Sequence, residues 1–205
     1  MSQRMRRFGY LVVEGPHDVE FCYRLLSHAK LERIQKLGKL DPFFKPLIPN
    51  SFPHDDDLQK RMPIPLFLQN DQFTIGLHSA IGETNLVSTL EETLSVLPVA
   101  SFCGVGMLLD ADSAISPAQR YESLRQRVRE KTRLELPDGA GQVRTSSSVR
   151  LGAFVLPDNA SPGTLEDLLL ESAATQYAKL LPLAQQYVRI QPPGIDNIVK
   201  PVKSG

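Results

Sequence analysis

The chain has 205 residues, of which 41% are hydrophobic and 22% charged, and this composition is typical of a folded globular protein. Its 23 lysine and arginine residues balance 23 aspartate and glutamate residues, which argues against a protein that coats nucleic acid nonspecifically. No apolar run approaches the roughly 18 residues that a membrane-spanning helix needs, and the basic residues 1–7 lead into a strand-like run instead of a signal region. We therefore expect a cytoplasmic protein with no membrane segment.

The first predicted unit is a strand, a tight turn and a helix. Residues 8–13 form a short apolar run that ends in two valines, and Glu14-Gly15-Pro16 follows, which is the pattern of a buried strand and a break. Behind Pro16, apolar residues recur every three or four positions, so we expect a helix with the proline in its first turn. Cys22 and Cys103 lie in apolar stretches without metal-ligand spacing, so neither a disulfide framework nor a zinc site is expected.

The next segment, residues 38–73, holds six of the sixteen prolines, a density that no regular helix tolerates. We expect an irregular proline-rich insertion or an extended arm there. Residues 73–79 then have the pattern of a second strand. Thr84 is expected to cap a helix that carries a leucine face and ends at Pro98.

The second half of the chain repeats the alternation of strand and helix. Residues 105–109 form a third apolar run, and Ser116-Pro117 opens a helix behind it. The elements expected after this helix are a loop at 135–148, a strand at 151–156, a long helix from Thr164 to about Leu181 and an extended tail at 191–205. This alternation implies an α/β fold with a mainly parallel central sheet flanked by helices, and we expect residues 1–205 to form a single domain.

Acidic residues follow three of the four predicted strands. They are Glu14 and Asp18 after the first, Asp110 and Asp112 after the third, and Asp158 and Glu166 after the fourth. In a parallel sheet the carboxyl ends of the strands meet at one edge, where these carboxylates would repel one another unless a cation neutralised them. Hard oxygen ligands suit Mg²⁺ or Mn²⁺. Each acid alone also fits a structural role, in the first turn of a helix or as the cap of a turn.

The order of these motifs resembles the TOPRIM fold, a Rossmann-like fold shared by topoisomerases, bacterial primases, recombination proteins, ribosomal RNA maturases and OLD-family nucleases. One strand ends in Glu14-Gly15, within the run Leu-Val-Val-Glu-Gly-Pro-His-Asp, and a later strand ends in Asp110-Ala-Asp112. The segment Gly163-Thr-Leu-Glu166 is similar to a further acidic motif of OLD-family nucleases and of small stand-alone TOPRIM proteins. The resemblance covers residues 7–171, with the proline-rich insertion as a departure.

The resemblance implies roles for five acidic residues. Glu14 corresponds to a glutamate that shuttles a proton or binds metal, and Asp110 and Asp112 correspond to the aspartates that hold Mg²⁺ or Mn²⁺ against a phosphodiester. Asp18 and Glu166 would bind a second ion, and two ions would clamp the attacking water and the leaving oxygen.

The function implied by the resemblance is a Mg²⁺- or Mn²⁺-dependent phosphodiesterase, a nuclease or nickase, that acts on nucleic acid, with DNA favoured over RNA. Ala114 stands where topoisomerases have a third acidic or amide residue, which favours hydrolysis over strand passage. The partner suggested by analogy is a separately encoded ATPase. Whether Lys200 or Lys203 corresponds to the late lysine of OLD-family nucleases stays open.

Two functions other than a nuclease are also considered for this sequence. One is a non-catalytic TOPRIM scaffold that binds nucleic acid or a protein, and the balanced charge is compatible with it. The other is a ribosomal RNA maturase, for which the sequence offers no RNA-binding module. Residues 119–150 contain eight basic and four acidic residues. We interpret this segment as a solvated helix face, with a local basic surface as the alternative.

Overall fold

The structure is a computed structural model that describes residues 6–49, 64–146 and 148–189. Contacts within the chain divide it into two compact units, Met1–Leu165 and Glu166–Gly205. The first unit contains the whole sheet, and the second contains most of the last two helices.

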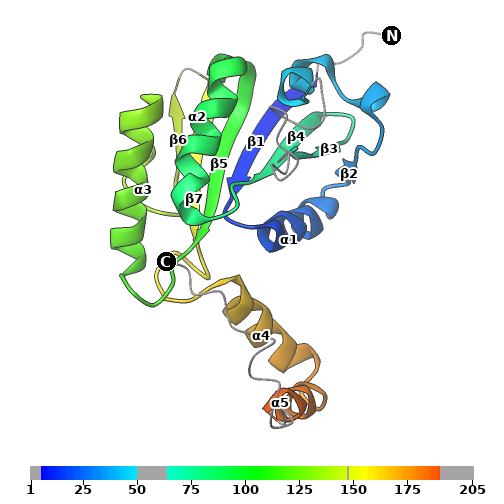
Figure 1. The fold of residues 1–205 in the computed structure, drawn as a ribbon, viewed down its shortest axis with the longest axis vertical. Coiled ribbons are helices and arrows are strands. Elements are labelled where there is room, and N and C mark those ends of the chain that lie inside the picture. The colour runs from blue at the N-terminus through cyan, green and yellow to red at the C-terminus, as the bar shows by residue number, and fades with distance from the viewer. Residues whose placement is uncertain (1–5, 50–63, 147, 190–205) are drawn as a thin grey trace. The chain divides into compact units, whose positions relative to one another are not determined.

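Seven strands form one sheet in the order β2-β3-β4-β1-β5-β7-β6 (Figure 1). They are β1 (Arg7–Val13), β2 (Glu32–Arg33), β3 (Leu66–Gln69), β4 (Phe73–Ser79), β5 (Phe102–Asp110), β6 (Val143–Ser146) and β7 (Val149–Leu156). The four neighbouring strands β4, β1, β5 and β7 are parallel, and the pairings outside them are antiparallel. The four strands predicted from apolar runs are these four, so the mainly parallel central sheet is confirmed.

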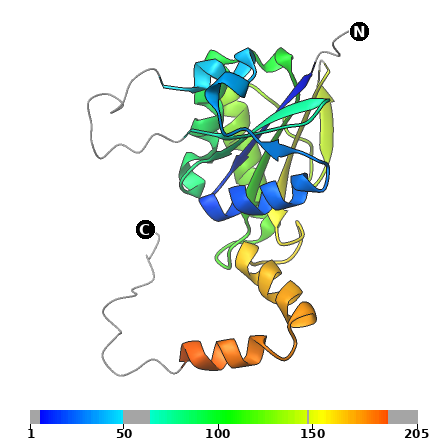
Figure 2. The same ribbon diagram turned by 90° about the vertical axis from the view of Figure 1, so that its right-hand side faces the viewer.

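The helices are α1 (Pro16–Ser27), α2 (Leu86–Val96), α3 (Pro117–Thr132), α4 (Leu165–Gln176) and α5 (Leu181–Arg189). In the first unit, α2 and α3 lie side by side over one face of the sheet, and α1 lies over the other (Figure 1 and Figure 2). This arrangement confirms the expected α/β class. Within the described residues, no helix is long and apolar enough to cross a membrane.

Both helices nearest the predicted acidic residues begin as the sequence predicts. Pro16 occupies the start of α1, where its missing N–H costs no hydrogen bond. Ser116 is the N-cap of α3, and its side chain accepts the N–H of Gln119 in a capping box. The apolar face of α3, formed by Tyr121, Leu124 and Val128, is buried in the core with the central strands.

Three predictions about the less regular segments are wrong. β3 lies within residues 38–73, where irregular structure was expected, and β6 lies in the expected loop at 135–148. The helix from Thr164 does not continue to Leu181, because α4 ends at Gln176 and α5 begins at Leu181. Pro182 gives a physical reason, since its ring would clash with the preceding turn of an unbroken helix. The expected tail at 191–205 and residues 50–63 of the insertion lie outside the described residues.

Candidate functional site

The carboxyl ends of β4, β1 and β5 form the edge of the sheet at which open α/β folds bind ligands, and we call this edge the crevice. The chain leaves β1 into α1 on one face of the sheet, and it leaves β4 and β5 into α2 and α3 on the other face (Figure 1 and Figure 2). Adjacent parallel strands whose connections depart to opposite faces leave a gap at their carboxyl ends, which is where ligands bind in open α/β sheets. β1 is therefore the switch point of this sheet.

Glu14 follows β1 directly and joins the ends of the three strands. Its Oε2 atom accepts the backbone N–H of Asp110 at 3.3 Å, and its backbone carbonyl accepts the N–H of Gly82 at 2.9 Å. Burial raises the pKa of the half-buried Glu14 side chain, the Asp110 N–H and Arg120 oppose that rise, and the carboxylates of Asp112 and Asp18 add to it. Burial therefore makes ionisation of Glu14 less favourable than ionisation of an exposed glutamate.

Asp110 and Asp112 lie at the end of β5, as predicted, and each carboxylate has a bonded partner. The Oδ1 atom of Asp110 accepts the N–H of Leu165 at 2.9 Å. Asp112 has a left-handed backbone with φ of 57°, fixed by two backbone hydrogen bonds with Gly163 at 3.0 and 3.2 Å. Its Oδ2 atom accepts a hydrogen bond from Nη2 of Arg120 at 2.6 Å. Asp tolerates this conformation better than most residues do.

The other predicted acids have different surroundings. Asp18 is buried, with 6% of its surface exposed, and its carboxylate accepts the N–H of Gly15, the N-cap residue of α1, at 2.7 Å. Asp158 is exposed and accepts the N–H groups of Ala160 and Ser161, which hold its pKa below the ordinary value. Glu166 is exposed in the first turn of α4 and belongs to the second unit.

A row of side chains with alternating charge lies beside this crevice, and the sequence pattern did not predict it. Nη2 of Arg120 bonds Asp112, and its Nη1 lies 3.4 Å from Oε2 of Glu83. The other oxygen of Glu83 lies 2.6 Å from Nη2 of Arg127. Arg120 also donates from Nε to the backbone carbonyl of Asp110 at 3.1 Å. Glu83 follows the turn after β4, so inspecting the residues behind every predicted strand would have found it.

The chemistry of these donors suits a hard divalent cation, since all of them are carboxylate oxygens. Their arrangement does not form a ready metal site. Within the part of the chain that the structure describes, no three His, Cys, Asp or Glu side chains are placed together as metal ligands. Asp112 is paired with Arg120 and Asp18 with the amide of Gly15. The set therefore fits a cation by its chemistry, provided that Asp112 exchanges its partner.

The comparisons with known proteins identify the family. The family described as "Protein of unknown function (DUF3226)" matches residues 9–195. The chain belongs to the DUF3226 family. Among solved structures it is similar to the hypothetical protein PH0156 from Pyrococcus horikoshii OT3, with a TM-score of 0.51 and 18% identity over 88% of this chain and 74% of that one. That likeness supports the fold alone, and no curated protein matches the chain.

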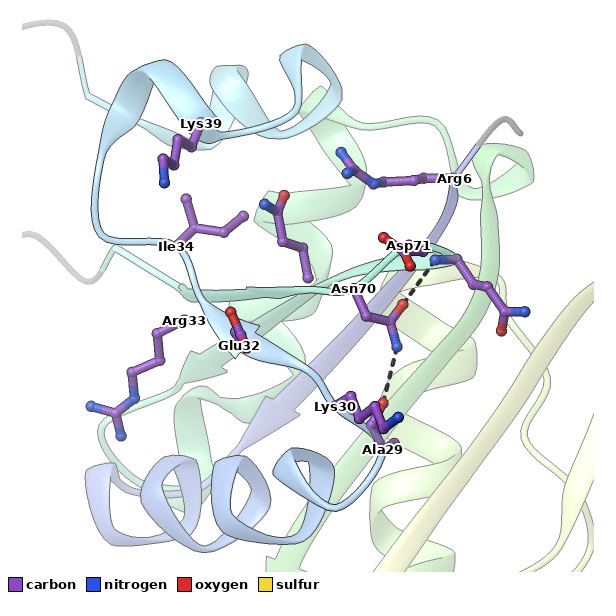
Figure 3. Close-up of a pocket in the computed structure, with 11 residues that line it drawn as sticks. Arg6, Ala29, Lys30, Glu32, Arg33, Ile34, Lys39, Asn70 and Asp71 are labelled. Atoms are coloured by element: carbon purple, nitrogen blue, oxygen red, sulfur yellow. Dashed lines mark hydrogen bonds between the residues drawn. The ribbon is translucent and has the colours of Figure 1, made fainter. Parts of the chain in front are cut away.

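In this DUF3226 chain a cavity of about 580 Å³ lies at the opposite, amino end of β1 and β4 (Figure 3). Its lining mixes both charges, with Arg6, Lys30, Arg33 and Lys39 against Glu32 and Asp71. Arg33 is already engaged by Glu20 and stacks on the ring of Tyr23. With four basic side chains against two acidic ones, the cavity suits a divalent cation less well than the carboxyl ends of the strands do. The crevice at the carboxyl ends is therefore the stronger candidate for chemistry.

Proposed function

We propose that the protein is a Mg²⁺- or Mn²⁺-dependent phosphodiesterase that acts on nucleic acid as a nuclease or nickase. The observation that carries this proposal is the pairing of Glu14 with Asp110 at the switch point of the sheet, 3.3 Å from carboxylate oxygen to amide nitrogen. Two acidic motifs that are far apart in sequence meet there. Their placement on neighbouring parallel strands is what the TOPRIM resemblance requires, and it supports that assignment.

The residues divide the proposed work between them. Asp110 and Asp112 would hold the cation, and a cation bound there would polarise the scissile phosphate and lower the pKa of a bound water. Glu14 is proposed for proton transfer or metal binding, because its carboxylate accepts the N–H of Asp110 beside the proposed ligands and burial raises its pKa above the ordinary value. DNA as substrate and a separate ATPase as partner complete the proposal by analogy.

The test compares two double variants at opposite ends of the sheet. Asp110→Ala with Asp112→Ala should abolish Mn²⁺ binding in calorimetry and Mg²⁺-dependent nicking of a supercoiled plasmid. Glu32→Ala with Asp71→Ala also removes two carboxylates, but from the cavity at the amino end, and should leave both properties as in the wild type. Nicking that survives the loss of Asp110 and Asp112 would overturn the proposal.

A non-catalytic scaffold is the second candidate, and the ion pair of Asp112 with Arg120 favours it. A carboxylate neutralised by an arginine needs no metal to be stable. For a scaffold, nucleic acid or a protein partner would bind without Mg²⁺, and binding of nucleic acid would weaken as salt increases. Gel-shift measurements with and without chelator, on the same two double variants, distinguish this candidate from the nuclease.

A further inference from the structure

Arg120 is held at three points in the acidic crevice. Its side chain is only 13% exposed, against 48% for the side chain of Asp112 and 24% for that of Glu83, between which it lies. Nε donates to the carbonyl of Asp110, Nη2 to Asp112, and Nη1 faces Glu83. A planar guanidinium with donors in a fixed fork suits such a position better than a lysine does.

We propose that Arg120 is an internal counter-ion of the acidic centre, which a divalent cation displaces from Asp112 while Glu83 retains the guanidinium. This inference rests on the proposed function, because it concerns the cation that the phosphodiesterase needs. It assigns a competitive role to Arg120 and a positioning role to Glu83.

The contacts support an exchange of partners instead of a rearrangement of the fold. The backbone of Asp112 is fixed by its two hydrogen bonds with Gly163, so a turn of the side chain is enough to release the arginine. Arg120 would keep its bond to the carbonyl of Asp110 and its contact with Glu83. Arg127 binds the other oxygen of Glu83 at 2.6 Å and so orients that carboxylate towards Arg120.

The exchange predicts changes of opposite sign in cation affinity. Arg120→Gln removes the competing positive charge and should lower the Kd for Mn²⁺ by about tenfold. This change corresponds to about 1.4 kcal/mol of binding free energy. Arg120→Lys keeps the competing positive charge, so the affinity for Mn²⁺ should stay within about threefold of the wild type. Glu83→Gln leaves Arg120 with Asp112 as its remaining carboxylate and should weaken Mn²⁺ binding by about threefold to tenfold.

A double-mutant cycle separates this coupling from the general loss of a negative charge. If Glu83 acts through Arg120, then Glu83→Gln should change the Mn²⁺ affinity by less than about twofold in the Arg120→Gln background. Glu122→Gln is the matched control, because it removes a carboxylate from the exposed side of α3 that pairs with Arg125 instead. It should leave the affinity unchanged.

The measurement is calorimetric titration of Mn²⁺ into the wild type and each variant, with thermal unfolding as the check on folding. An unchanged or weaker affinity in Arg120→Gln overturns the proposal, as does an equal loss from Glu83→Gln in both backgrounds. If Arg120→Gln does not fold, the comparison of Glu83→Gln with Glu122→Gln decides. A loss of Mn²⁺ affinity in Glu83→Gln alone supports the proposal, and an equal loss in both variants overturns it. If the folded wild type and variants all fail to bind Mn²⁺, the proposed function fails and the inference with it.

Discussion

The same central strand contributes to two regions with opposite chemistry. Tyr10 of β1 is buried, and its hydroxyl oxygen lies 2.7 Å from Oγ1 of Thr93 and 2.5 Å from Nδ1 of His78. Four residues later Glu14 enters the crevice, where the groups around it are charged. In the first region, hydrogen bonds between Tyr10, Thr93 and His78 satisfy the buried polar groups. In the second region, ion pairs between carboxylates and arginines do so.

Because of this difference, the two regions tolerate different kinds of substitution. A close-packed interior responds strongly to added volume, because neighbouring atoms have little room to move. A crevice that is partly open to water accepts small changes of shape but responds to a change of charge. Volume changes near Tyr10 should therefore alter stability, and charge changes near Glu14 should alter pH dependence and cation affinity.

The largest effect on stability is expected from Gly76→Ala in β4. A Cβ atom at this position would lie 2.9 and 3.0 Å from two carbons of the Tyr10 ring, so the ring or the strand must shift. We expect the free energy of unfolding to fall by about 2 kcal/mol, measured by urea denaturation. Gly38→Ala is the control, because no atom lies within 4 Å of the added Cβ, and it should change stability by less than about 0.5 kcal/mol. Equal effects of the two substitutions would contradict the packing explanation.

A smaller loss is expected from Ser116→Ala, which affects the helix that carries Arg120. Ser116 Oγ accepts the N–H of Gln119 at 3.2 Å, and this capping bond contributes about 1 kcal/mol in typical helices. Ser123→Ala, an exposed interior position of the same helix, should be neutral or slightly stabilising because alanine has the higher helix propensity. Chemical denaturation of both variants checks the difference, and a loss in Ser123→Ala as large as that in Ser116→Ala would argue against the cap.

The smallest effect is expected from Glu14→Gln, and it should depend on pH. Burial raises the pKa of Glu14 above its ordinary value of 4.5, so the folded state binds the proton more tightly than the unfolded state does. The cost of ionising Glu14 is absent below that ordinary value and grows as pH rises through the folded-state pKa. Glutamine never ionises, so the variant should match the wild type near about pH 4 and gain less than about 1 kcal/mol at about pH 7, because water screens a half-buried group.

Urea denaturation with a chelator present at both pH values measures this gain. The same gain at both pH values would mean that ionisation of Glu14 is not its cause. Glu122→Gln serves as the exposed control on α3 and should show no such pH dependence.

The fold was predictable where the sequence pattern reflects burial. The central strands are apolar runs because helices cover them, and Val12, Leu109 and Val155 are fully buried. β6 could not be predicted in the same way, since all four of its residues are exposed and its apolar pattern is absent. β2 has only two residues, too few for any period to show. These strands depend on pairing with neighbours, which is tertiary information.

The candidate site was predictable in part for a related reason. Glu14, Asp110 and Asp112 were found because they directly follow apolar runs, and parallel strands bring such positions together. Arg120 gave no comparable signal, because it is one of several arginines along a polar helix. Its burial depends on a contact with Glu83, 37 positions earlier in the numbering, and with the carbonyl of Asp110. Sequence spacing does not encode such a contact between separate elements.

The two outer strands have a consequence for how the chain behaves before it is fully folded. Parallel sheets assemble slowly, and an open strand edge can meanwhile recruit another chain. Within the described residues, β2 and β6 each pair on one side only, and they offer edges of two and four residues. The two-residue edge consists of an exposed glutamate and an exposed arginine. A neighbouring chain would find little backbone to extend along these two strands.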